Sequence, residues 1–113
     1  MSRTASATRK LVAAAPVFAA LGDETRLQLV TRLSDGPQST SQLTASTALT
    51  RQAVTKHLQA LANAGLVRDT HAGRERLWEL HPGGLDAARH TLDQLSAQWD
   101  VALGRLARMV ETK

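Results

Sequence analysis

The chain has 113 residues, 42% of them hydrophobic, which is enough for one domain with its own core. It contains no cysteine, so disulfides, thiolate metal sites and cysteine nucleophiles are excluded, and a cytoplasmic location fits. The formal net charge of +4 favours a polyanionic partner. With one Phe, two Trp and no Tyr, the composition argues against a stacking platform for single-stranded nucleic acid.

The N-terminal region begins with a small, polar and basic stretch, 1–8, which we expect to be a disordered arm ahead of a single domain over 9–113. A helix that Pro16 kinks or divides is then predicted by apolar residues at helical spacing: Leu11, Ala14, Phe18 and Leu21. Basic residues before an apolar run imitate a signal peptide. The run is short, contains Pro16 and continues into the helical pattern, which argues against secretion. No stretch approaches the ~20 apolar residues of a membrane span.

The next helix is predicted to begin after Asp23, a good N-cap, and to end at the turn 35–37, which contains Gly and Pro. Its apolar stripe consists of Leu27, Leu29, Val30 and Leu33. A short helix follows, with Ser39 or Thr40 as its cap and Leu43 as its clearest apolar contact. Together with the helix after it, this short helix forms a candidate helix-turn-helix.

The stretch from Thr50 to Gly65 predicts an amphipathic helix capped by the first of these residues and stopped by the second. Its apolar face consists of Val54, Leu58 and Leu61, with Ala53 and His57 at the margin. The opposite face carries amides, a hydroxyl and an ammonium group: Gln52, Thr55, Lys56, Gln59 and Asn63. These groups suit base edges and phosphates, and no acid lies between residues 36 and 67. An ordinary solvated helix face is the alternative.

Alternating residues after Gly65 predict two short strands, about 66–71 and 75–80, joined by a tight turn at Gly73. We expect Trp78 or Leu77 to pack inward. A hairpin directly behind such a helix is the layout of a winged helix. The predicted fold is therefore mainly α (α+β), a winged helix-turn-helix of about five helices and a two-stranded hairpin.

The C-terminal third predicts one long helix, because apolar residues recur in steps of three and four: Leu85, Ala88, Leu92, Leu95, Trp99, Ala102, Leu106 and Met109. At ~1.5 Å per residue it spans on the order of 40 Å, too long for so small a domain to cover alone. Burial by a second chain and packing on the first helix are both compatible with this pattern. Asp86, His90 and Asp93 share another face, which permits metal coordination in principle, although a solvated polar face is the simpler interpretation.

Three segments resemble the ArsR family of winged helix-turn-helix repressors. They are F-A-A-L-G-D-E-T-R-L-Q-L-V at 18–30, L-T-R-Q-A-V-T-K-H-L-Q-A-L-A-N-A-G-L-V at 49–67 and G-R-E-R-L-W-E-L at 73–80. Glu24 stands where many members have proline. The cysteine pair of metal-sensing members is replaced by Ser39 and Ser41, whose hydroxyls do not substitute for thiolates. We expect these serines to contact phosphate or cap the helix.

The resemblance implies a homodimer that contacts DNA with two recognition helices. On this sequence it places the DNA-binding residues, together with the outward helix face, at Ser39, Ser41, Thr50, Arg51, Gln52, Thr55, Lys56, Gln59, Arg74 and Arg76. His57 lies at the apolar margin, where we favour a half-buried packing role over base contact. The dimer interface implied through the first and last helices consists of Leu11, Phe18, Leu21, Leu92, Leu95, Trp99, Leu106 and Met109.

The leading hypothesis is a dimeric, sequence-specific repressor of double-stranded DNA without a thiolate metal site. Its operator would be an inverted repeat with half-sites roughly 10–10.5 bp apart, or a multiple of that. One alternative is a winged-helix dimer that binds an acidic protein, and another is a repressor with a non-cysteine metal or small-molecule effector site. We expect neither a cofactor nor enzymatic activity, because the sequence has no recognisable nucleophile arrangement and no Gly-rich phosphate loop.

Overall fold

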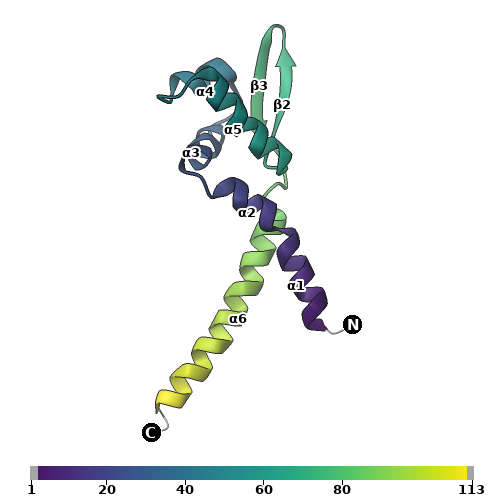
Figure 1. The fold of residues 1–113 in the computed structure, drawn as a ribbon, viewed down its shortest axis with the longest axis vertical. Coiled ribbons are helices and arrows are strands. Elements are labelled where there is room, and N and C mark those ends of the chain that lie inside the picture. The colour runs from purple at the N-terminus through teal and green to yellow at the C-terminus, as the bar shows by residue number, and fades with distance from the viewer. Residues whose placement is uncertain (1–2, 112–113) are drawn as a thin grey trace. The chain divides into compact units, whose positions relative to one another are not determined.

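Figure 1 shows the computed structural model of the chain, which describes residues 3–111. The elements are α1 (Arg3–Ala13), α2 (Ala15–Leu21), α3 (Glu24–Leu33), β1 (Gln38–Ser39), α4 (Thr40–Ala45), α5 (Arg51–Asn63), β2 (Val67–Ala72), β3 (Glu75–Leu80) and α6 (Asp86–Glu111). The chain forms two compact units: 15–85, and the residues up to 14 together with those from 86 onward. The expectation of a single domain over 9–113 stays a prediction. Apolar periodicity shows which residues share a face but not which faces meet, so this division was not visible in the sequence.

The N-terminal helix is divided near Pro16, as predicted, into α1 and α2. Pro16 lies in the first turn of α2, where a missing backbone N–H breaks no helical hydrogen bond. The prediction of a disordered arm over 1–8 is wrong from Arg3 onward, because α1 begins there; residues 1–2 lie outside the described part. The physical reason is that Ala, Arg and Lys favour helix and that no Gly or Pro interrupts this stretch.

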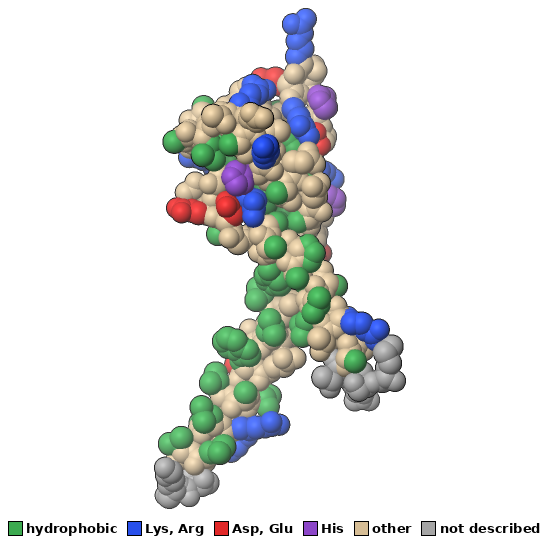
Figure 2. All heavy atoms as spheres, in the orientation of Figure 1, with side chains coloured by type: hydrophobic (Ala, Val, Ile, Leu, Met, Phe, Trp, Pro, Cys, Tyr) green, Lys and Arg blue, Asp and Glu red, His purple; other side chains and the backbone are tan. Residues whose placement is uncertain are grey.

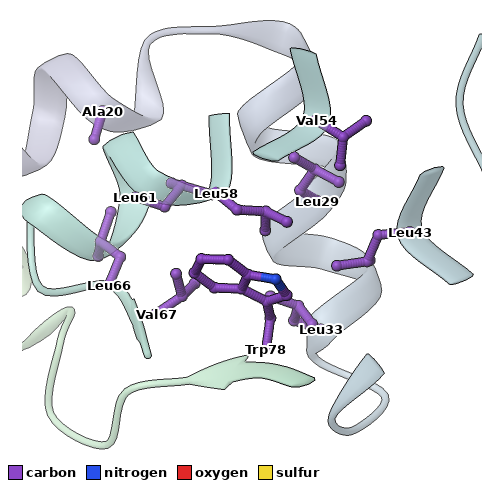
Figure 3. Packing of buried hydrophobic residues seen from close by; sticks show 10 residues of the cluster. All are labelled: Ala20, Leu29, Leu33, Leu43, Val54, Leu58, Leu61, Leu66, Val67 and Trp78. Atoms are coloured by element: carbon purple, nitrogen blue, oxygen red, sulfur yellow. The ribbon is translucent and has the colours of Figure 1, made fainter. Parts of the chain in front are cut away.

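The core of the 15–85 unit is built around Trp78, which is completely buried. Figure 3 shows this ring among hydrophobic side chains from α2, α3, α4, α5, β2 and the residue before β2: Ala20, Leu29, Leu33, Leu43, Val54, Leu58, Leu61, Val67 and Leu66. The indole Nε1–H donates to the Thr40 hydroxyl at 3.0 Å, so the one polar group of the ring is satisfied. Full burial of each large side chain stabilises the fold by about 1.5–3 kcal/mol. Trp78 therefore packs β3 into the same core as the four helices α2, α3, α4 and α5.

The sheet of this unit is antiparallel and has three strands in the order β1-β3-β2. The predicted hairpin is confirmed, with Val67 opposite Leu80 at one end and Ala72 opposite Glu75 at the other. Its two-residue turn has Gly73 at φ 64°, a conformation that glycine adopts without strain. The sequence did not predict β1, because two residues are too few to show an alternating pattern.

The wing leaves and rejoins the rest of the unit beside the end of α5. Gly65 has a φ of 79° and ends the helix, and the Leu66 N–H donates to the Leu61 carbonyl at 3.0 Å. After β3, the His81 N–H donates to the Leu66 carbonyl at 2.9 Å. Gly84 then passes so close that a Cβ placed on it would lie 2.6 Å from the Gly65 carbonyl oxygen. Glycine at this position permits close approach of two backbone segments.

Two ion pairs cross the hairpin from β2 to β3. Arg68 Nε lies 2.8 Å from Glu79 Oε1, and Arg76 Nε lies 2.6 Å from Asp69 Oδ2. The hydrogen bond from Arg76 holds the pKa of Asp69 below its usual value, against the opposing effect of desolvation. The Asp69–Arg76 pair is thus favoured in the form in which the aspartate is charged.

The long C-terminal helix is confirmed as α6, which has 26 residues and is about 40 Å long at ~1.5 Å per residue. Ala88 and Thr91, near its start, are buried. Within residues 3–111, no helix combines the length and the hydrophobicity that crossing a membrane would require. Most of α6 beyond its first turns is exposed in the single chain.

We predict that Gly84→Ala destabilises the protein, because its Cβ would displace the Gly65 carbonyl. Overpacking of this kind costs about 1–3 kcal/mol, which lowers the thermal unfolding midpoint by several degrees, to be measured by circular dichroism. Gly104→Ala is the matched control, because its Cβ would meet only the Arg108 side chain, at 3.6 Å, and alanine favours helix. Equal midpoints for the two variants would contradict this account of Gly84.

We predict that Asp69→Asn weakens the acid dependence of stability. Since the folded-state pKa of Asp69 is lowered, its contribution to stability is present above the unfolded value of 3.8 and is lost as pH falls through the lower folded-state pKa. Thermal midpoints of the wild type should therefore fall more steeply than those of the variant between about pH 5 and about pH 3. Glu75→Gln is the control, since it removes a carboxylate from the same hairpin without breaking an ion pair among the described residues. Parallel curves for wild type and Asp69→Asn would refute the prediction.

Candidate nucleic-acid interface

The orientation of α5 is fixed by its apolar face. Val54, Leu58 and Leu61 each have 0% exposure, as the sequence predicts. The predicted N-cap is also confirmed, because Thr50 Oγ1 accepts a hydrogen bond from the Ala53 N–H at 3.1 Å. With one face buried and the helix start capped, the opposite face of α5 is turned to solvent.

The outward face of α5 differs between its two halves. In the first half, Gln52 and Lys56 are exposed, and neither side chain makes a hydrogen bond to any residue that the structure describes. Thr55 is half-buried and donates its hydroxyl hydrogen to the Arg51 carbonyl at 2.8 Å. In the second half, Gln59 Nε2 donates to Asn63 Oδ1 at 3.1 Å. The side chains of the first half are therefore the ones available to a ligand.

The helix-turn-helix is held together at its exposed edge by a contact between its two helices. Arg51 Nη1, at the start of α5, donates to the hydroxyl of Ser41 in α4 at 3.0 Å. Both residues are exposed, so the structure brings them together on one surface. The Ser41 hydroxyl keeps its own hydrogen available for donation to a further acceptor.

For Ser39, the structure corrects the prediction of a DNA-binding role. Ser39 is only 4% exposed and caps α4: its Oγ accepts from the Gln42 N–H at 3.1 Å, while its own N–H donates to Gln42 Oε1 at 2.8 Å. This reciprocal pair is a capping box. Ser39 also belongs to β1, where it lies opposite Leu77. The strand buries this serine and removes it from any DNA-facing surface, while the helix-capping role that the sequence also allowed is confirmed.

The two arginines predicted in the wing lie in different environments. Arg74 occupies the turn, is exposed, and makes no hydrogen bond or ion pair with the described chain. Arg76 is instead engaged by its own chain. It pairs with Asp69, donates from Nη2 to Gln59 Oε1 at 3.3 Å, and places its guanidinium carbon 4.3 Å from the centroid of the Trp78 ring. Only Arg74 is thus unengaged at the tip of the wing.

His57 lies at the margin of the α5 core, half-buried, as the sequence predicts. Its Nδ1 is 3.5 Å from Arg26 Nη1 and 3.9 Å from Asp23 Oδ1. Arg26 also donates to the carbonyls of Ala19 and Ala20, in the last turn of α2. The Arg26 backbone N–H is the main cause of the lowered pKa of Asp23, and the charges of His57 and Arg26 add to it. This cluster attaches α5 to α2 and α3.

The charge of the 15–85 unit is unevenly distributed. The acid-free stretch between residues 36 and 67 covers β1, α4 and α5. Figure 2 shows Lys and Arg side chains spread over the visible face of this unit, with Asp and Glu in fewer, separate places. A helix-turn-helix without carboxylates places no negative charge of its own against a phosphate backbone.

The polar face of α6 carries Asp86, His90 and Asp93, all exposed. Among residues 3–111, the side chains of His, Asp and Glu form no group of three or more that could hold a metal ion. Within the described part of a single chain, these three residues do not form such a group.

The apolar stripe of α6 is exposed over most of its length, as Figure 2 shows by the hydrophobic side chains along this helix. Of the predicted interface residues, four are exposed: Leu92, Trp99, Leu106 and Met109. Leu95 is half-buried, and so are the three predicted in the N-terminal helices: Leu11, Phe18 and Leu21. Leu103 and Val110 are also exposed, and the helical spacing places them beside the same stripe although the prediction missed them.

Comparisons with known proteins agree with this geometry. Residues 23–69 match the model of bacterial regulatory proteins of the arsR family. The chain is 38% identical over 94 residues to the HTH-type transcriptional regulator Rv2034 of Mycobacterium tuberculosis, covering 83% of this chain and 85% of that protein.

Two solved structures show the same fold. An ArsR-like transcriptional regulator from Rhodococcus sp. RHA1 has 37% identity and a TM-score of 0.73, with 90% of this chain and 93% of that one covered. A homodimeric winged helix-turn-helix DNA-binding domain from Mycobacterium bovis, described as a possible ArsR-family regulator, has 27% identity and a TM-score of 0.62, with 87% of each chain covered. The chain therefore belongs to the ArsR family and is a transcriptional regulator with a winged helix-turn-helix DNA-binding domain.

Proposed function

We propose that this regulator is a homodimeric repressor that binds an inverted repeat in double-stranded DNA through α5. The observation that carries the proposal is the state of Gln52 and Lys56. Both are exposed and without hydrogen bonds to the described chain, on a helix whose opposite face is completely buried. A helix of this kind fits the major groove, which is wide enough to admit it and presents a distinct pattern of donors and acceptors for each base pair.

Each exposed side chain suits a particular part of the duplex. The Gln52 amide has a donor and an acceptor and matches the edge of adenine, whereas Lys56 suits guanine or phosphate. We assign contacts with the DNA backbone beside the groove to Arg51, Ser41, Thr50 and Thr55. Arg74, at the tip of the wing, is placed for backbone or minor-groove contact. Phosphate contacts would fix the register, and Gln52 and Lys56 would read the sequence.

The second chain of the dimer is inferred from α6. A contiguous exposed stripe that includes Leu92, Trp99 and Leu106 is unusual on a monomeric protein and is typical of an interaction surface. The related domain from Mycobacterium bovis is described as homodimeric, which supports a second copy as the occupant. A two-fold dimer would place its two α5 helices in major grooves about 34–36 Å apart, or at a multiple of that distance.

The proposed repressor works without thiolate metal sensing or catalysis. The chain has no cysteine, so a soft metal ion has no thiolate ligand. The sequence also has no recognisable nucleophile arrangement and no Gly-rich phosphate loop, which argues against catalysis. We place this function in the cytoplasm, where the DNA of a bacterium lies.

The proposal is tested by fluorescence anisotropy with the full chain and two duplexes, the DNA upstream of its own gene and a shuffled sequence of equal composition. We expect tighter binding to the upstream DNA and a steep loss of affinity between about 50 and about 200 mM salt, as released counterions require. Equal affinity for both duplexes would overturn sequence-specific regulation. Binding to an acidic protein that persists at high salt, with no binding to DNA, would indicate an interaction module instead.

We predict that Gln52→Ala removes discrimination at one base pair of each half-site, at a cost of ~1–3 kcal/mol. A panel of duplexes with single base-pair changes measures this. Gln28→Ala is the matched control, because Gln28 is an exposed glutamine on α3, away from the outward face of α5. An unchanged base preference in Gln52→Ala would remove this residue from the proposed interface.

We predict that Trp99→Asp dissociates the dimer. Trp99 is 68% exposed in the single chain, and a central tryptophan contributes about 2–4 kcal/mol to an interface, or ~30–1,000-fold in the dimer dissociation constant. Val101→Asp is the control, since Val101 is exposed to a similar degree but faces away from the stripe. Sedimentation velocity should show a monomer for the first variant and a dimer for the second. A monomeric wild type at micromolar concentration would contradict the proposed assembly.

A further inference from the structure

We propose that Arg76 is a positioning residue that fixes the Gln59 amide so that its unused N–H, rather than its oxygen, is the group offered to DNA. The inference rests on the proposed function, because it concerns how α5 and the wing meet DNA. It assigns to Arg76 a role other than direct DNA contact. It also predicts which chemical groups of the duplex can lie against the second half of α5.

The guanidinium of Arg76 is held on three sides by its own chain. Nε donates to Asp69 Oδ2 at 2.6 Å, Nη2 donates to Gln59 Oε1 at 3.3 Å, and the guanidinium carbon lies 4.3 Å from the centroid of the Trp78 ring. Asp69 and Trp78 belong to the hairpin, whereas Gln59 belongs to α5. A side chain fixed in this way links the wing to the recognition helix. It has little freedom to turn toward a phosphate.

The orientation of the Gln59 amide follows from this contact. A guanidinium has donors only, so the group of Gln59 that faces Arg76 has to be the acceptor oxygen. The amide nitrogen then points to Asn63, and Nε2 donates to Asn63 Oδ1 at 3.1 Å. The amide oxygen of Gln59 and that of Asn63 are thus both engaged, while each NH2 group keeps an N–H that is not used.

The groups of these two amides that make no hydrogen bond within the described chain are N–H donors, whereas each oxygen already accepts one hydrogen bond. A bidentate contact with adenine requires the donor and the acceptor of one amide to face the same base edge, so the contact of the Gln59 oxygen with Arg76 disfavours it. Donors match hydrogen-bond acceptors, which on DNA are the N7 and O6 atoms of guanine and the phosphate oxygens. Gln52, whose amide is not engaged by the described chain, keeps both functions.

The test compares Arg76→Met with Arg74→Met, two variants that remove one positive charge each from the wing. Binding of the full chain to the upstream duplex is measured by anisotropy over a range of salt concentrations. If Arg76 acts through Gln59, its variant leaves the slope of log affinity against log salt unchanged, while Arg74→Met reduces that slope by about 1. A reduction of about 1 in Arg76→Met, with unaltered base preference, would show direct phosphate contact and overturn the proposal.

Base preference supplies the second measurement. In Arg76→Met the Gln59 amide is free to rotate. Measured with the panel of single-substituted duplexes, this variant should bind more tightly to duplexes with adenine at one position. That position should be the one at which Gln59→Ala also changes base preference. If Gln59 faces phosphate instead, both variants weaken all duplexes equally, and the salt slope still separates Arg76 from Arg74. A shift at a position unaffected by Gln59→Ala would contradict the inference.

If Arg76→Met does not fold, the variant Gln59→Glu tests the inference instead. A glutamate still accepts from Arg76 but no longer has an outward N–H, so the fold should be retained, as judged by thermal unfolding, and affinity should fall at least about 3–10-fold. Wild-type affinity in Gln59→Glu would overturn the inference. If the wild-type chain binds the upstream and the shuffled duplex equally well, the proposed function is refuted. Failure of the proposed function is thus seen in the wild type, whereas failure of the inference about Arg76 is seen only in the variants.

Discussion

The winged-helix unit depends on the burial of a single aromatic side chain. Trp78 contacts the core from β3, and its only polar group donates to Thr40 at the start of α4. A buried indole without this acceptor would leave an unsatisfied donor, which costs about 1–3 kcal/mol. Because the ring and its hydrogen bond reach different elements, the same residue holds the hairpin, the short helix and the recognition helix in one arrangement. The surface proposed to face DNA is a consequence of that arrangement.

Much of this fold was predictable because its elements carry long, regular patterns. The 13-residue α5 has enough turns for its apolar face to be recognised, and its caps are residues whose side chains or backbone favour helix ends. The hairpin was predictable from alternation around Gly73. By contrast, β1 is too short to show a period. The start of α1 at Arg3 depends on the helix propensity of its residues, whereas the polar composition of this stretch had suggested disorder.

The candidate site was predictable only in part, because exposure and pairing depend on contacts between distant residues. The outward direction of Gln52 and Lys56 follows from helical spacing alone. The burial of Ser39 does not, since it results from pairing of β1 with β3. Arg76 also looked available in the sequence, but its partners are 7 and 17 residues away and meet it only in the folded chain. Local sequence patterns therefore identify which face of a helix is exposed to solvent. Which side chains on that face make no hydrogen bond within the chain depends on the folded structure.

The separation of the two faces of α5 has an evolutionary consequence. Val54, Leu58 and Leu61 supply the stability of this helix from one side, while Gln52 and Lys56 on the other contribute nothing that the fold requires. Substitutions at these two outward positions are expected to change stability by no more than about 0.5 kcal/mol. Duplicated copies of such a gene could thus acquire new target sequences one residue at a time without passing through unfolded intermediates.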